Sequence, residues 1–176
     1  MRHVVLPLAA VAAVAATLSS SSASFADART AREIDSGLVI AKSSNKNQVR
    51  YALDVDAACA PTGAQPVHAY WRMFERGPDA TEPLTAREQR AFGVERQVVD
   101  GDDVRVVLRG LPDRAITLRT FRARDGRCAC AATTTIEGTR ARIASVYVKL
   151  SLFGVSYVQL DGVAPTGAAL SERLSP

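Results

Sequence analysis

Apolar and polar residues alternate with a period of two through most of the chain after residue 37. Successive side chains of a strand point to opposite faces of a sheet, so this alternation predicts strands with one buried and one wet face. Between residues 48 and 56 the expected buried face is Val49, Tyr51, Leu53 and Val55. Between residues 143 and 150 it is Ala144, Val146, Val148 and Leu150. Nine strands are expected, at 37–42, 48–56, 66–75, 94–99, 104–108, 115–122, 127–137, 143–150 and 155–162.

Short polar segments separate these strands, and short connections favour antiparallel neighbours. One helix is expected at 86–92, because Thr85 and Glu88 have the spacing of a capping box. Gly93 is expected to end it in a left-handed conformation. The predicted fold class is therefore all-β, an antiparallel sandwich or up-and-down barrel of about nine strands with one short helix.

The first 26 residues have the pattern of a secretory signal peptide. A short basic start precedes the apolar run 4–18, and residues 24–26 fit a small-x-small cleavage site before Asp27. The run is shorter than the roughly 20 residues that span a bilayer, so no transmembrane segment is expected after cleavage. The expected organisation is a signal peptide at 1–26, a leader segment at 27–36 and a single β-rich domain at 37–174, exported to the periplasm or the extracellular space.

Basic residues concentrate between positions 105 and 142, a segment that contains nine Arg and three acidic residues. A local excess of this kind attracts anionic surfaces, which suggests a patch for an anionic partner. The candidate residues are Arg105, Arg109, Arg122 and Arg124. The chain also has 19 Arg against three Lys, so Arg is simply its habitual basic residue. Nucleic acid is not an expected partner, because this stretch lacks interleaved aromatic residues and the chain has an export signal.

Few residues suit catalysis or metal binding. After the signal, His68 is the one histidine, and it lies mid-strand without a neighbouring carboxylate in the sequence. A metal site with several histidines is thereby excluded, and no metal or other cofactor is expected. Asp54 and Asp56 share the polar face of a predicted strand, where acidic side chains are expected to be solvated. A hydrolase that combines His68 with partners from distant loops remains an alternative.

The chain has three cysteines after the signal, Cys59, Cys128 and Cys130. Export is expected to place them in an oxidising compartment, where disulfides persist. A disulfide from Cys59 to either Cys128 or Cys130 is predicted, which leaves one free thiol. Cys128 and Cys130 lie two residues apart on one strand, so a bond between them would strain that strand. A redox-active Cys-x-Cys pair is the alternative interpretation.

The polar turn 43–47 and the aromatic residues near it form a candidate binding site for a ligand or partner. Its residues are Asn45, Asn47, Arg50, Tyr51, Tyr70 and Trp71. In this hypothesis Asn45, Asn47 and Arg50 edge the site, and the aromatic side chains form its floor. The structural alternative is that the Asn side chains bond to the turn backbone and fix the strand register.

Several short motifs follow one another along the chain. They are residues 45–51, 65–67 leading to Tyr70-Trp71, Leu84-Thr85, 90–94, 158–162, 165–167 and Glu172-Arg173. In their order and spacing the chain resembles the exported bacterial family catalogued as domain of unknown function 4833, over roughly residues 37 to 174. It departs from that pattern at Phe92, where similar proteins often have Tyr, and in the Cys128/Cys130 pair. The family has no assigned activity, so the resemblance implies export and one β-rich domain but no catalytic residue.

Together, these features favour a non-enzymatic binding module of the envelope or extracellular space. Such a module could hold a small apolar ligand if its strands enclose a cavity. It could instead dock another envelope component through the Arg-rich stretch. The hydrolase is the third alternative.

Overall fold

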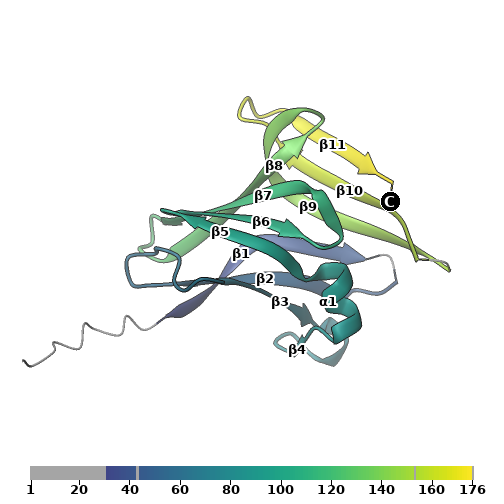
Figure 1. Ribbon diagram of the computed structural model, residues 1–176, viewed down its shortest axis with the longest axis horizontal. Coiled ribbons are helices and arrows are strands. Elements are labelled where there is room, and N and C mark those ends of the chain that lie inside the picture. The colour runs from purple at the N-terminus through teal and green to yellow at the C-terminus, as the bar shows by residue number, and fades with distance from the viewer. Residues whose placement is uncertain (1–30, 43, 153, 176) are drawn as a thin grey trace, which may run out of the picture.

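The computed structural model describes residues 31–42, 44–152 and 154–175. Within these residues, eleven strands form one mostly antiparallel sheet, accompanied by one α-helix and one 3-10 turn (Figure 1). In chain order the elements are β1 (Arg32–Lys42), β2 (Gln48–Val55), β3 (Val67–Arg72), η1 (Phe74–Arg76), β4 (Thr81–Pro83), α1 (Ala86–Phe92), β5 (Val94–Asp100), β6 (Asp103–Leu108), β7 (Leu111–Arg122), β8 (Cys128–Ile136), β9 (Thr139–Ser151), β10 (Gly154–Val163) and β11 (Ala169–Leu174). The predicted signal peptide, 1–26, lies outside the described residues.

The prediction of an all-β fold with one short helix is confirmed. All nine expected strands occur, and two short strands that were not expected join them. β4 pairs with β3, and β11 pairs with β10. The strand expected at 66–75 ends at Arg72, and Phe74 begins the 3-10 turn instead. β1 begins at Arg32, so part of the expected leader segment belongs to the sheet.

The sheet forks at β9, the longest strand. The beginning of β9 pairs with β8, whereas its later part pairs in parallel with β1. The opposite edge of β9 pairs with β10. Two arms therefore leave the same edge of β9, one made of β1, β2, β3 and β4 and the other of β8, β7, β6 and β5. The arms lie one in front of the other in Figure 1, and a single hydrophobic core lies between them.

A bend in β1 allows this one strand to pair with both β2 and β9. The register with β2 is interrupted between Asp35 and Val39, where Gly37 has a φ of 72°. The fully buried Ser36 hydroxyl stabilises the bend by donating to the Tyr51 carbonyl at 2.6 Å. Beyond the bend, β1 pairs with β9 from Ile40 onward.

The sheet is not closed into a barrel, because no ladder joins β3 to β5. A side chain bridges this seam instead. The Gln97 amide accepts from the Val67 N–H at 2.9 Å and donates to the Val67 carbonyl at 3.2 Å. One side-chain amide thus satisfies both backbone groups of Val67, much as a neighbouring strand would.

The buried faces follow the predicted alternation in β2, where Val49, Tyr51, Leu53 and Val55 are fully buried. In β9 the prediction for Ala144 was wrong, because this side chain is exposed. The register with β10 shifts here, with Ile143 opposite Gly162 and Ser145 opposite Asp161. Ala144 is the extra residue of this bulge, and the alternation changes phase across it.

Helix α1 has the predicted capping box. The Thr85 hydroxyl accepts from the Glu88 N–H at 3.3 Å, and the Glu88 carboxylate accepts from the Thr85 N–H at 2.9 Å. The left-handed ending expected at Gly93 was wrong, because Gly93 is extended, with φ −66° and ψ 158°. Glycine is needed there for space, since a Cβ would lie 2.3 Å from the Gln89 carbonyl oxygen.

Candidate functional site: an apolar cavity under helix α1

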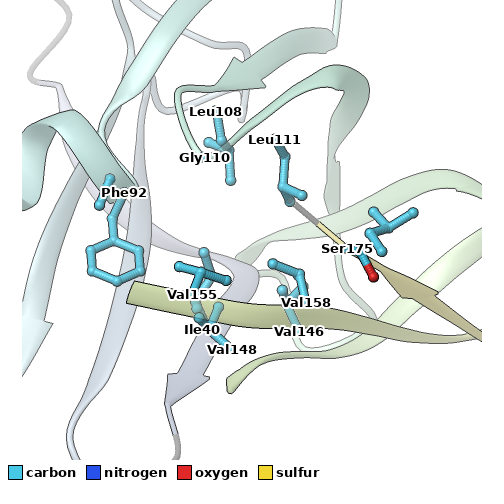
Figure 2. Close-up of a pocket in the computed structure, with 12 residues that line it drawn as sticks. Ile40, Phe92, Leu108, Gly110, Leu111, Val146, Val148, Val155, Val158 and Ser175 are labelled. Atoms are coloured by element: carbon cyan, nitrogen blue, oxygen red, sulfur yellow. The ribbon is translucent and has the colours of Figure 1, made fainter. Parts of the chain in front are cut away.

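An apolar cavity of about 280 Å³ lies where α1 and the β6–β7 turn meet the sheet around β9 (Figure 2). Figure 2 shows Phe92 on one side, the β6–β7 turn on another, and β10 crossing in front. The sheet contributes Ile40, Val146, Val148, Val155 and Val158. The lining therefore comes from segments that are far apart in the sequence.

Three contacts hold the end of α1 over the cavity. The buried Tyr51 hydroxyl donates to the Phe92 carbonyl at 2.6 Å. The Arg109 N–H of the β6–β7 turn donates to the Gly93 carbonyl at 3.0 Å. Gly110 in that turn approaches so closely that a Cβ would lie 2.4 Å from the Ala91 carbonyl oxygen. These contacts fix the helix that forms one wall.

The side chains that line the cavity are almost all apolar. Among the described residues that line the cavity, Ser175 has the one side-chain hydroxyl, and none is charged, a histidine or a cysteine. No group there can transfer a proton at neutral pH or act as an activated nucleophile. An apolar surface of this kind gains free energy when it removes apolar ligand surface from water.

The fold does not bring the six residues of the predicted binding site together. Tyr51 and Trp71 are core residues, whereas Arg50 and Tyr70 are paired neighbours on the other face of the β2–β3 ladder. Arg50 donates to Asp35 at 2.8 Å. Burial, with the nearby carboxylates Asp35 and Glu33, raises the pKa of Tyr70.

The turn asparagines have structural contacts. The Asn45 side-chain oxygen accepts from the Asn47 N–H at 3.1 Å, and Asn47 itself is buried. This geometry supports the structural alternative for the turn.

Trp71 packs beside the cavity wall without lining it. Its ring contacts Phe92 edge-on with centroids 5.8 Å apart, and the Lys42 ammonium lies 4.2 Å from its centroid. Burial opposes ionisation of Glu88, yet two hydrogen bonds from Thr85, together with the Lys42 charge, hold the pKa of Glu88 below its usual value.

The four arginines of the predicted anionic-partner patch are dispersed. Arg109 lies in the β6–β7 turn, whereas Arg122 and Arg124 lie at the other end of β7. The Arg122 guanidinium donates hydrogen bonds to the backbone carbonyls of Ala57 and Gly126. Arg105 lies mid-strand on an exposed face of the sheet.

Arg105 belongs to a cluster of charged side chains with Asp103, Arg119 and Arg140, and the sequence analysis did not predict this cluster. Arg119 forms two hydrogen bonds with Asp103, at 2.6 and 2.7 Å. These bonds outweigh partial burial and, with the charges of Arg119, Arg140 and Arg105, lower the pKa of Asp103. The register of β6 with β7 creates this pair, because it places Asp103 opposite Arg119.

Cys59 and Cys128 form a disulfide with their Cα atoms 5.3 Å apart, which confirms the predicted disulfide and selects Cys128 as the partner. Cys130 is a free, partly buried thiol. Burial raises the pKa of Cys130 to about 12. A thiol with a raised pKa is a poor nucleophile, so this environment differs from that of reactive cysteines.

His68 lies between two carboxylates that its sequence neighbourhood did not reveal. Its ring nitrogens are 2.9 Å from Glu33 and 3.9 Å from Asp54. The expectation that Asp56 is solvated was wrong: β2 ends at Val55, and Asp56 turns inward to accept from the Ala58 and Ala60 N–H groups. Among the described residues, no group of three His, Cys, Asp or Glu side chains is placed to hold a metal ion.

Comparison with known protein families gives a match that covers most of the chain. Residues 38–173 match the sequence model of a protein family that is described as a domain of unknown function (DUF4833). The chain belongs to the DUF4833 family. No curated protein and no solved structure matches it significantly. Within the part of this DUF4833 protein that the structure describes, no helix has the length and apolar character required to cross a membrane.

The C-terminal motifs of this DUF4833 domain build the β9–β10–β11 part of the sheet. Asp161 accepts hydrogen bonds from Ser145, Gln159 and Ser171, one from each of the three strands. These bonds lower the pKa of Asp161, with partial burial opposing them. Gly162 packs against β9, since a Cβ there would lie 2.7 Å from the Arg142 carbonyl oxygen. These motif residues position the sheet beside the cavity.

Proposed function

We propose that this protein is a non-catalytic binding module that holds a small apolar molecule in the cavity under α1. The observation that carries the proposal is the apolar lining of a 280 Å³ space. An apolar cavity of about 150 Å³ accepts benzene, and ligand sites begin at roughly 300 Å³. The occupant is therefore small, with about the bulk of two fused aromatic rings.

The expected affinity follows from the buried area. Burying about 200 Å² of apolar ligand surface contributes at most about 5 kcal/mol before the cost of association is subtracted, so the dissociation constant should be about 0.2 mM or weaker. The neutral probe 1-naphthol fits this description, and its hydroxyl has Ser175 as a polar neighbour at the rim. Calorimetric titration of the protein with 1-naphthol measures the constant directly.

A pair of matched variants localises the binding. Val155 lines the cavity and is 39% exposed, so Val155→Trp should block the mouth without disturbing the core. Val99, on β5, is 38% exposed and does not line the cavity, which makes Val99→Trp the control. We expect 1-naphthol to bind at least tenfold more weakly to Val155→Trp and with unchanged affinity to Val99→Trp. Equal affinities for the two variants would contradict the proposal.

We propose further that the module acts outside the cytoplasm, after cleavage between Ala26 and Asp27. The apolar N-terminal sequence and the disulfide support this location, since disulfides persist in oxidising compartments. The mass of the protein recovered from cells tests it. An N-terminus at Asp27 is the expected result, whereas a chain that still begins at Met1 or carries a lipid would overturn the proposal.

A further inference from the structure

We propose that the β9–β10 hairpin is a docking element for an anionic phospholipid bilayer, with the Leu152 side chain, directly after β9, entering the interface. Figure 1 shows this hairpin reaching past the rest of the molecule, at the same end as the β1–β2 turn. The proposal rests on an exposed apolar side chain, on the placement of the lysines, and on continuity with the cavity.

Described residues at the end of this hairpin expose apolar side chains to solvent. Leu152 is 99% exposed, and Val155 is 39% exposed across the hairpin from Leu150. Single exposed apolar residues are common on soluble proteins, but full exposure on a projecting hairpin places this side chain ahead of the surrounding surface. An element with this shape can insert its apolar end between lipid head groups while the sheet stays in water.

The lysines gather at the same end. The chain has 19 Arg but only three Lys, at positions 42, 46 and 149. Lys42 pairs with Val148 in the parallel ladder, directly before Lys149 on β9, and Lys46 follows in the β1–β2 turn. Lys46 and Lys149 are exposed, and neither forms an ion pair with a described residue. Glu75 lies near Lys46 in the same shallow depression, and Lys42 covers Trp71.

Apolar insertion and attraction to anionic lipid both contribute to the binding of a protein to a membrane. A single acyl chain gives only marginal, reversible binding, and stable attachment needs a second signal such as a basic patch. Each lysine near an anionic surface strengthens binding by about fivefold. Leu152 supplies the apolar signal here, and Lys46 and Lys149 supply the basic one.

Docking in this orientation also places the cavity at the membrane surface. Val155 belongs both to the apolar end of the hairpin and to the cavity lining. The proposed function explains why such a position is useful, because apolar molecules concentrate in bilayers. The docking itself depends only on the hairpin and the lysines, so it can be tested independently of the cavity.

Vesicle sedimentation tests the proposal. Purified protein, with its N-terminus determined by mass spectrometry, is mixed with vesicles of phosphatidylcholine and phosphatidylglycerol or of phosphatidylcholine alone. We expect binding to the anionic vesicles and little to the neutral ones. Leu152→Asp should weaken binding more than tenfold, and Lys46→Gln/Lys149→Gln should weaken it roughly 30-fold.

Two controls match these changes. Phe121→Asp alters an apolar residue that is 45% exposed near the other end of the sheet, and Arg105→Gln/Arg124→Gln removes the same charge elsewhere. Both controls should bind as the unchanged protein does. No binding to anionic vesicles, or equal losses in the controls, would overturn the proposal. So would a Leu152→Asp variant that changes from dimer to monomer in size-exclusion chromatography without any vesicle binding, because the hairpin would then contact a second copy.

Discussion

The hydroxyl of Tyr51 connects the core to the cavity wall, and its removal has a calculable cost. Tyr51→Phe keeps the buried ring but deletes the donor that lies 2.6 Å from the Phe92 carbonyl oxygen. A buried hydrogen bond contributes about 1 kcal/mol, and a carbonyl left without a partner adds to the loss. We expect the free energy of unfolding to fall by about 1–2 kcal/mol, measured by equilibrium urea unfolding.

Tyr147→Phe is the matched control for this change. Tyr147 is partly buried, and its hydroxyl makes no hydrogen bond with a described residue. Its loss should change the free energy of unfolding by less than about 0.5 kcal/mol. An unshifted urea midpoint for Tyr51→Phe, or equal shifts in both variants, would refute the reasoning.

The same residue predicts a pH dependence. Burial raises the pKa of Tyr51 well above its ordinary value, so the folded protein keeps this proton when the unfolded chain has lost it. The resulting stability is complete below pH 10, where unfolded tyrosine is protonated, and is lost as the pH rises further. At about pH 11 the loss reaches roughly 1.4 kcal/mol, so wild type and Tyr51→Phe should become about equally stable there. The Cys130 thiol contributes equally to both proteins. A stability difference that stays constant from pH 9 to about pH 11 would contradict this linkage.

Three further outcomes are expected. Unfolded wild-type protein should show one reactive thiol without reductant and three reactive thiols after reduction. The unfolded Cys130→Ala variant should show no reactive thiol before reduction. Two or more thiols in unreduced wild-type protein would contradict the Cys59–Cys128 disulfide. Asn45→Ala should lower the free energy of unfolding by about 1 kcal/mol, because the Asn47 N–H loses its acceptor, and unchanged urea unfolding would instead favour a binding role for the turn. Gln97→Ala should lose about 1–2 kcal/mol and speed hydrogen exchange at the Val67 amide, and an unchanged exchange rate would show that the seam does not depend on this side chain.

Local patterns predicted local structure in this chain. The capping box at Thr85 depends on residues three apart, and alternation within a strand depends on immediate neighbours, so both could be read from the sequence. The backbone conformation of Gly93 could not be read from the sequence, because glycine accepts either sign of φ. A glycine is needed there because the Gln89 carbonyl leaves no room for a Cβ. Ala144 was misplaced because a bulge in the pairing of β9 with β10 shifts the alternation by one residue, and this pairing is not visible in the residues next to Ala144.

The candidate site was less accessible than the fold. The apolar face of β9 was expected, but nothing local shows that it meets Phe92 and Leu111 around an empty space. The predicted site at the β1–β2 turn combined residues from both faces of one ladder, such as Tyr51 and Tyr70. Which strands pair, and with which register, is decided by contacts between distant segments, and one sequence does not specify them.

The fork at β9 has a consequence for the order in which the chain can fold. β1 is synthesised first and can pair early with β2, but its other partner, β9, lies late in the chain, and β8 pairs with the same edge of β9. Until β9 exists, a growing chain holds two separate groups of strands with no strand to join them. Contacts between such distant residues require the closure of a long loop and form slowly. Folding should therefore wait for a nearly complete chain, and a chain that stops before β9 would expose unpaired strand edges that invite aggregation.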